Sequence, residues 1–327
     1  MKAETAIAGR RGAEERYGKA GKHPGWRRLI LIAAVVAALL LLFVFTPRFF
    51  NPLNLKNILV QSSTLGLMAI GMTLVYLIGG MDLSIPSVMA LCGILGALVM
   101  KNGGHPLASV LAALLLGGLV GAVNGFSVAK LKMIPFVVTL AMMQVMSGAS
   151  TWITNSVSIA VPLGYINIIL FKIAGLPLPV YIFVLVTALS TWFCRKTVTG
   201  RWIYAVGSNL GTAKVCGIPT QKIIMGTYIT SGLFAGLTGV LLTARLGAAG
   251  PLMGSSNVIL DVMSASVVGG VSIYGGIGSP LGAALGAVII TILNNILNLM
   301  QVDFFPAQVI KGVIVITFVA LDSIRRK

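Results

Sequence analysis

Long apolar runs recur along the whole chain and constrain its fold more than any other feature. A membrane-spanning helix needs about 20 mostly apolar residues, and ten segments of this sequence qualify. Their approximate limits are 27–45, 55–78, 84–100, 107–129, 134–152, 179–194, 222–244, 258–274, 280–299 and 306–323. The segments 84–100 and 258–274 are short and rich in glycine, so each is either a full span or a broken, re-entrant helix. The sequence predicts an all-α polytopic membrane protein.

The composition excludes a water-soluble globule. Of the 327 residues, 57% are hydrophobic and only 9% are charged, which leaves too little polar surface to face water. The net charge of +17 does not indicate nucleic acid, because the basic residues lie in the tail and in short loops rather than in one groove with interleaved aromatic residues. The cysteines Cys92, Cys194 and Cys216 show no CxxC spacing, so they predict neither a disulfide framework nor a metal site.

The lysines and arginines predict the orientation. The first 28 residues are polar, carry eight of these basic residues, and precede an apolar run with no small-residue cleavage site. We therefore expect residues 1–28 to form a disordered cytoplasmic tail and residues 29–327 to form a single transmembrane domain. An even number of spans then places most basic residues inside, satisfies the positive-inside rule, and makes both termini cytoplasmic. Lys311 is an exception, because it lies within the last predicted span.

A basic, glycine-punctuated stretch at 200–222 interrupts the apolar sequence. Asn209 is a good N-cap, residues 210–216 make about two helical turns, Gly217 suits a left-handed C-cap, and Pro219 forbids continuation. So short a helix is marginal alone and is normally kept where a partner packs on it. We interpret it as a docking element at the membrane face; an ordinary loop helix is the alternative.

Two groups of residues carry a family resemblance. The first is Gly200, Arg201, Tyr204, Ala205, Gly207, Asn209, Ala213, Gly217 and Ile218, and the second is the GG-x-D-LS segment with Gly79, Gly80, Asp82 and Ser84. Together they resemble ABC importer permeases of the ribose, xylose, arabinose and autoinducer-2 branch, in which the first group forms a cytoplasmic loop inserted into the ATPase subunit. The second group is a recurrent structural signature of that family. The resemblance covers most of residues 50–323.

The resemblance implies that an ATPase-coupling loop lies within 200–222. Its coupling residues would be Arg201, Asn209, Ala213, Lys214, Gly217 and Ile218. The sequence departs from the family at Gly211 and Thr212, because relatives usually carry an acidic residue and a pair of alanines there.

Polar residues inside apolar spans are functional candidates, because lipid cannot satisfy them. Asp82 and Ser84 stand at a helix start, which favours a capping role over substrate contact. Asp261 begins a serine- and glycine-rich span where relatives usually have glutamate followed by Ile-Ala-Ala. The candidate residues for a translocation pathway are Asn124, Thr139, Gln144, Ser264, Ser266, Asn294 and Asn298. Packing between helices is the alternative role for each amide.

A faint internal symmetry relates the two halves. Pro135 follows Asn124 by eleven positions, and Pro306 follows Asn295 by eleven positions. The two segments run in opposite directions in the predicted topology. This pattern predicts an inverted repeat of spans two to five and seven to ten, the build of transporters with a pathway near the midplane.

Several catalytic motifs are missing from the sequence. It contains no GxxxxGK[ST] motif to cradle phosphates. It also has no paired carboxylates or histidines inside the predicted spans for acid–base or metal chemistry. We predict no catalytic residues, no metal and no cofactor in this chain, with ATP bound by a partner subunit.

These observations predict the permease subunit of an ABC importer for a monosaccharide or similar small polyhydroxylated solute, in the bacterial inner membrane. The expected partners are a cytoplasmic ATPase, a periplasmic sugar-binding protein and a second permease, either the same chain or a paralogue; nucleic acid is not among them. The alternative is a secondary active transporter of a small metabolite. Such a carrier would hold an ion-coupling carboxylate near the midplane, whereas Asp82, Asp261 and Asp303 are predicted to lie near span ends.

Overall fold

The computed structural model describes residues 47–303, 305–313 and 316. The predicted tail, the predicted first span, the end of the last span and the C-terminus lie outside the described residues. The chain divides into two compact units, Met1–Asn51 and Pro52–Lys327. Within the first unit, the 3₁₀ helix η1 (Pro47–Phe50) is the described element.

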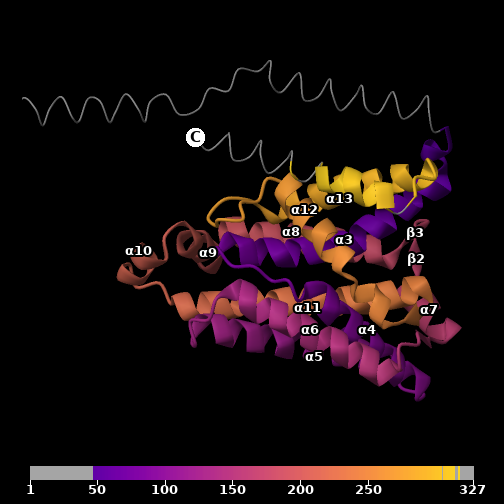
Figure 1. Cartoon of the computed structure of the whole chain (residues 1–327), viewed down its shortest axis with the longest axis horizontal. Coiled ribbons are helices and arrows are strands. Elements are labelled where there is room, and N and C mark those ends of the chain that lie inside the picture. Colours follow the sequence, from indigo (N-terminus) through magenta and orange to yellow (C-terminus); the bar gives the residue numbers. More distant parts are fainter. Residues whose placement is uncertain (1–46, 304, 314–315, 317–327) are drawn as a thin grey trace, which may run out of the picture. The chain divides into compact units, whose positions relative to one another are not determined.

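The second unit is a bundle of apolar helices (Figure 1). Its main helices are α3 (Pro52–Leu77), α4 (Ile85–Lys101), α5 (Pro106–Ala129), α6 (Pro135–Thr154), α8 (Leu178–Lys196), α11 (Thr220–Leu246), α12 (Ser256–Val268) and α13 (Pro280–Leu299). Residues 305–313 are also helical. Within the described part of the chain, seven helical segments are long and apolar enough to cross a membrane, counting η2 (Pro251–Gly254) together with α12, and α4 is a shorter apolar helix. Each predicted span from 55–78 to 280–299 therefore coincides with a helix, which confirms an all-α polytopic membrane protein.

The core lies around α3 and α4. Residues 62–77 of α3 are buried without interruption, as expected for a helix that is apolar on every side. α3 packs against α8, α11, α12 and α13, whereas α4 packs against α5, α6 and α11. The central position of α3 explains why its sequence shows no polar face.

Small residues set the closest helix contacts. A Cβ added at Gly117 of α5 would collide with the carbonyl oxygen of Gly232 on α11, and one at Gly286 of α13 would collide with the carbonyl oxygen of Ala265 on α12. Small residues at these positions therefore let α5 approach α11, and α12 approach α13, closely.

Two segments enter the bundle from opposite ends and begin a helix inside it. After α3, the chain turns at Gly79 (φ +74°) and runs back along α5, α6 and α11 to the start of α4. After α11, it turns at Gly247 (φ +71°), forms strand β4 (Ala248–Ala249) and η2, and reaches the side of α4 near Ser87. Both helices that follow, α4 and α12, begin beside other helices rather than at a surface loop.

The prediction for residues 258–274 is wrong at its C-terminal end. α12 stops at Val268 because Gly269 and Gly270 (φ +82°) break it, and residues 269–279 form a loop before Ser279 caps α13. With 13 residues, α12 is about 20 Å long at 1.5 Å per residue, which is shorter than the hydrocarbon layer of about 30 Å. α12 is thus the broken segment, whereas α4 is a continuous helix of 17 residues.

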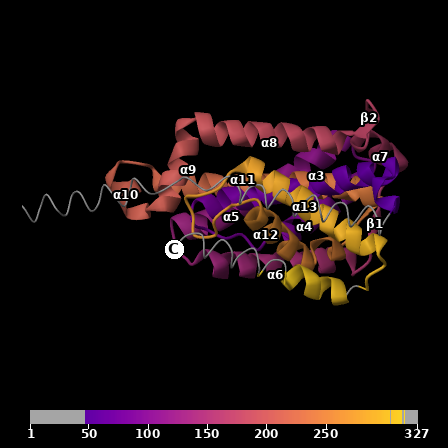
Figure 2. The same cartoon turned by 90° about the horizontal axis from the view of Figure 1, so that it is seen from above.

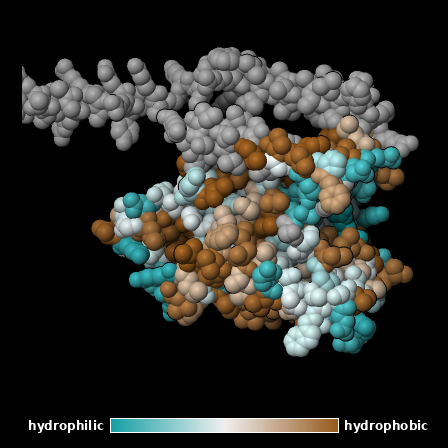
Figure 3. Space-filling model, viewed as in Figure 1, coloured by the Kyte–Doolittle hydropathy of each residue, from teal (hydrophilic) through white to brown (hydrophobic). Residues whose placement is uncertain are grey.

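The connecting elements gather at two opposite ends of the bundle (Figures 1 and 2). At one end, called here the α10 end, lie α9 (Val198–Ser208) and α10 (Leu210–Val215). At the other, the α7 end, lie α7 (Leu163–Ile169), strands β2 (Lys172–Ile173) and β3 (Leu176–Pro177), and β1 (Ile159–Ala160), which pairs with β4 in antiparallel register. Between the two ends, apolar side chains cover much of the face shown in Figure 3.

Candidate functional site

The helix predicted within 200–222 forms at the α10 end. The Oδ1 atom of Asn209 accepts a hydrogen bond from the backbone N–H of Thr212 at 2.9 Å, which confirms the predicted N-cap. At the other end, the N–H of Gly217 (φ +75°) donates to Lys214 and the N–H of Ile218 donates to Ala213, both at 3.0 Å. This pair of bonds is a Schellman motif. Cys216 is the C-cap, so the helix ends one residue earlier than predicted.

α10 is exposed, whereas α9 is firmly attached. Ala213 is the buried residue of α10, and Val215 is 90% exposed. On α9, by contrast, the hydroxyl of Tyr204 donates to the carbonyl of Gly278 at 2.9 Å, and Gly207 lies directly against the carbonyl of Leu77 at the end of α3. Burial raises the pKa of Tyr204 to about 12, so its hydroxyl stays protonated and remains a donor at neutral pH.

The predicted coupling residues differ in exposure. Ala213 is buried and packs with the apolar cluster around Leu74 and Ile203, and Ile218 is half-buried. The exposed members are Arg201, Asn209, Lys214 and Gly217. Arg201 and Lys214 place two positive charges at the α10 end of the bundle. The capped helix α10 adds exposed apolar surface there, for example at Val215.

A cleft of about 360 Å³ lies between α10 and the membrane helices. Leu210 and Lys214 line it from α10, and Gly79 and Gly80 line it from the turn after α3. The remaining walls come from residues 128–135 and from the start of α11. The cleft therefore lies between α10, which carries the predicted coupling residue Lys214, and the Gly79–Gly80 pair of the second resemblance group.

Asp82 lies at the centre of a fully buried polar cluster. Its Oδ1 accepts from the N–H of Ser84 at 3.1 Å and from the Ser84 hydroxyl at 2.6 Å, and its Oδ2 accepts from the hydroxyl of Ser231 at 2.9 Å. Asn124 donates to the Ser84 hydroxyl at 3.0 Å. Tyr228 donates to the carbonyl of Met81 at 3.1 Å. These bonds hold residues 81–84 against α5 and α11, and the Oδ1 atom of Asn124 is buried without a hydrogen-bond partner among the described residues.

This position corrects the expectation that Asp82 lies at a span end. Ser231, its partner, is about 16 Å along α11 from Thr220 at 1.5 Å per residue, so Asp82 is well inside the bundle. The difference arises because residues 79–84 turn back between helices after α3 instead of crossing a surface. Ser84 occupies the N-cap position of α4 but makes no side-chain cap bond; its hydroxyl donates to Asp82 and accepts from Asn124 instead.

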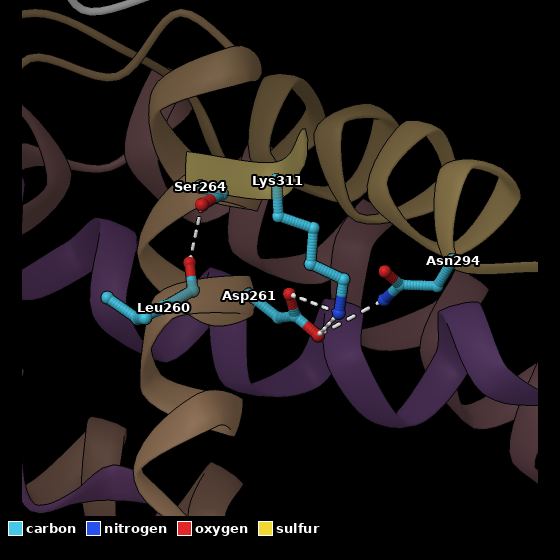
Figure 4. Close-up of polar contacts among 5 residues, drawn as sticks. All are labelled: Leu260, Asp261, Ser264, Asn294 and Lys311. Atoms are coloured by element: carbon cyan, nitrogen blue, oxygen red, sulfur yellow. Dashed lines mark hydrogen bonds and ion pairs between the residues drawn. The ribbon is translucent and has the colours of Figure 1, made fainter. Parts of the chain in front are cut away.

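Asp261 belongs to a second polar cluster, between α12, α13 and the helix at 305–313 (Figure 4). The ammonium of Lys311 lies 3.4 Å from Oδ1 and 3.5 Å from Oδ2 of Asp261, and Asn294 donates its Nδ2 to the same Oδ2 at 3.1 Å. The Asp261 and Lys311 side chains remain about one-quarter exposed, at 21% and 25%. The Oδ1 atom of Asn294 is buried without a hydrogen-bond partner among the described residues.

The other pathway candidates do not converge on one site. Thr139 donates to Pro135 and Met81, and Ser266 contacts Thr73 and Ala69 of α3. Ser264 donates to Leu260 of its own helix. These three are buried in helix packing, whereas Gln144 and Asn298 are exposed on the outside of the single chain.

Several hydrogen-bonding partners of the candidate residues were not predicted from the sequence. Ser231 and Tyr228 sit on α11 at positions with no distinguishing pattern, and Asn54 forms a reciprocal amide pair with Asn295 at 2.7 and 3.0 Å. Lys311 did carry a signal. A lysine inside an apolar span requires a counter-charge, and Asp261 was the acidic candidate in the same half of the sequence.

The helices and the exposed α9–α10 segment are those of a polytopic membrane protein with a projection at one end. Comparison with known proteins gives its family. Residues 54–321 match the family described as "Branched-chain amino acid transport system / permease component", and the chain belongs to this family of transport permeases.

Three relatives show how far the similarity extends. The ribose import permease protein RbsC of Escherichia coli (strain K12) is 36% identical over 302 residues, which cover 90% of this chain and 91% of the relative. The D-allose transport system permease protein AlsC of the same strain is 36% identical over 303 residues, covering 91% and 90%. The probable ABC transporter permease protein y4mJ of Sinorhizobium fredii is 33% identical over 298 residues, covering 90% and 88%. No solved structure matches this chain. The resemblance drawn from the sequence is confirmed at the level of the family.

Proposed function

We propose that this chain is the membrane-spanning subunit of an ABC importer that carries a monosaccharide or a similar small polyhydroxylated solute into the cell. The family match supports the transport role, and the ribose and allose permeases, 36% identical to this chain over nine-tenths of its length, support a sugar as the substrate. The family description itself refers to branched-chain amino acids, so the substrate class depends on the relatives.

The observation that carries the coupling role is the construction of α9 and α10. α10 is a two-turn helix capped at both ends and exposed to a partner, and α9 connects it to the end of α3 and to the loop before α13. A cytoplasmic ATPase that moves on nucleotide binding would bind α10. Because α9 is attached to both halves of the bundle, such a movement reaches the helices and exchanges outward- for inward-open states.

The arrangement of helices supports an inverted repeat. α5 packs on α11 as α13 packs on α3, while α4 and α12 each begin inside the bundle after a segment that enters from opposite ends. In this proposal α3 to α6 correspond to α11, α12, α13 and the helix at 305–313. Ten spans with both termini cytoplasmic complete the topology, and the α10 end faces the cytoplasm.

The assembly that follows has four further components. Two ATPases would bind the α10 helices of two permeases, which are two copies of this chain or this chain and a paralogue. A periplasmic sugar-binding protein would deliver the substrate at the α7 end, in the inner membrane of a bacterium.

Proteoliposomes that contain the chain with its ATPase test this function. We expect uptake of a sugar that requires ATP and the binding protein, and we expect Gly217→Pro to abolish it, because proline cannot adopt a φ of +75° and has no N–H for Lys214. The matched control is Gly103→Pro at the α7 end. Gly103 also has a positive φ (+78°) and donates its N–H to a helix carbonyl, that of Met100.

Two outcomes would contradict the proposal. Full transport by Gly217→Pro would show that α10 does not couple to the ATPase. Uptake by the chain without any ATPase would instead indicate a secondary active transporter. The exposed thiol of Cys216, at the C-cap of α10, provides a direct check on the contact, because a cross-linker attached there should capture the ATPase subunit.

A further inference from the structure

The ion pair of Asp261 and Lys311 lies within the length of the spanning helices. Its amide partner, Asn294, is five positions before the last residue of α13, Leu299, which places it about 8 Å from that helix end at 1.5 Å per residue. Charged side chains at such depth are costly in lipid, and in membrane proteins they face the protein interior or a water-filled cavity.

The helices that the structure describes leave these charges partly exposed. The side chains of Asp261 and Lys311 are 21% and 25% exposed, although Asp82, the other carboxylate inside the bundle, is 2% exposed. A surface that exposes charge inside a membrane must face either an aqueous pathway or a second subunit rather than lipid. In the proposed assembly of two permeases, both descriptions apply to the interface between the two subunits.

The hydrogen-bonding capacity of the cluster is only partly used. The Lys311 ammonium has three N–H donors, and the contacts described for it are with the one carboxylate of Asp261, at 3.4 and 3.5 Å. The partly exposed carboxylate can accept from neighbouring hydroxyls and the partly exposed ammonium can donate to hydroxyl oxygens, while Asn294 holds the carboxylate from the buried side. The charges of the pair cancel, so the cluster offers strong polar groups without attracting ions of one sign.

These features match a neutral polyol. Each hydroxyl of a sugar donates one hydrogen bond and accepts others, and a sugar loses water on entering the membrane, so it requires acceptors and donors within a small area. We propose that Asp261, Lys311 and Asn294 form a hydroxyl-binding station on the translocation pathway that selects the sugar, a role that rests on the proposed function. At this station Asp261 binds hydroxyl groups, while Lys311 holds the carboxylate in place and donates to hydroxyl oxygens.

The test measures sugar uptake and ATP hydrolysis together in proteoliposomes that contain the ATPase and the binding protein. For Asp261→Asn we expect uptake to fall at least tenfold while hydrolysis stimulated by the binding protein stays within about twofold of the wild type. The number of ATP molecules used per sugar therefore rises. A purely structural ion pair would lower uptake, hydrolysis and thermal stability in parallel, and that result would overturn the inference.

Two further variants keep the test decisive. Asp261→Glu preserves the charge and lengthens the side chain, so it should assemble even if Asp261→Asn does not, and it should change the order of uptake rates among pentoses, hexoses and their deoxy analogues. The exchange of Asp261→Lys with Lys311→Asp restores the ion pair but interchanges acceptor and donor beside Asn294. Continued low uptake by this double variant supports the station, and wild-type uptake would leave the pair with a structural role only.

The failure of this inference can be told from failure of the proposed function. If the wild-type chain shows no ATP-dependent uptake of any sugar, the proposed function is wrong. If the wild type transports sugar and Asp261→Asn and Asp261→Glu transport the same sugars at the same rates, only the station is wrong.

Discussion

The two carboxylates inside the bundle, Asp82 and Asp261, have the same chemistry and opposite surroundings. Asp82 is 2% exposed and accepts three hydrogen bonds from serines of its own chain. Asp261 is 21% exposed, faces a lysine, and lies beside an amide oxygen with no partner among the described residues. In the proposed repeat, Asp82 lies just before α4, and Asp261 lies within the corresponding helix α12. Because each cluster contains an amide oxygen without a partner among the described residues, that of Asn124 or of Asn294, the difference between the clusters is in the exposure of the carboxylate. A buried carboxylate with three donors fixes the backbone, whereas a partly exposed one leaves capacity for a ligand.

The largest expected difference is in folding stability. Asp82→Ala removes the acceptor of three buried donors, and each unsatisfied buried group costs about 1–3 kcal/mol, so we expect the free energy of unfolding to fall by about 3 kcal/mol or more. Asp261→Ala leaves a lysine that is 25% exposed rather than three buried donors, so we expect a smaller loss than for Asp82→Ala. Thermal unfolding of both variants in the same detergent measures the difference. Equal losses would mean that the two clusters have the same structural role.

A smaller difference is expected between two serines of the apolar helices. The hydroxyl of Ser231 donates to the Asp82 carboxylate, whereas that of Ser264 donates to the carbonyl of Leu260 in its own helix. A hydrogen bond to a charged group contributes about 1.5–3 kcal/mol, so Ser231→Ala should destabilise the protein by that amount. Ser264→Ala should stay within about 0.5 kcal/mol of the wild type. An unfolding series that ranks Ser264→Ala as the more damaging change would contradict the assignment of bonds.

The smallest effect concerns two buried tyrosines. Tyr228 donates to the carbonyl of Met81 and so holds the segment that carries Asp82, and its loss in Tyr228→Phe should cost about 1 kcal/mol. Tyr76 is equally buried, but its hydroxyl has no hydrogen-bond partner within the described residues. Tyr76→Phe should therefore leave stability unchanged or raise it. Hydrogen exchange at residues 79–84 gives a local measure, since only Tyr228→Phe should speed exchange there.

The apolar helices were predictable because each is a local pattern. The positions of α3 to α6, α8, α11 and α13 follow from runs of about 20 apolar residues, and the caps of α10 follow from Asn209 and Gly217. The end of α12 was less predictable. Gly269 and Gly270, which follow the helix, were visible in the sequence. Valine and isoleucine lie on both sides of them, however, so the apolar run is longer than the helix.

The polar clusters could be predicted only in part. Asp82 and Asp261 were identified as unusual because a charge in an apolar stretch is costly wherever it lies. Their partners were not identified, since Ser231 is 149 positions from Asp82 and Lys311 is 50 positions from Asp261. No local spacing rule relates residues that meet across separate helices.

The sequence by itself determined that this chain spans a membrane, that it forms helices, and that a short capped helix interrupts them, because hydropathy and capping depend on neighbouring residues. The residues of two short segments also indicated its family. Only the tertiary structure decided which carboxylate is satisfied and which is open. That distinction depends on partners from separate helices, Ser231 of α11 for Asp82 and Lys311 for Asp261, which only the packing of the helices brings together.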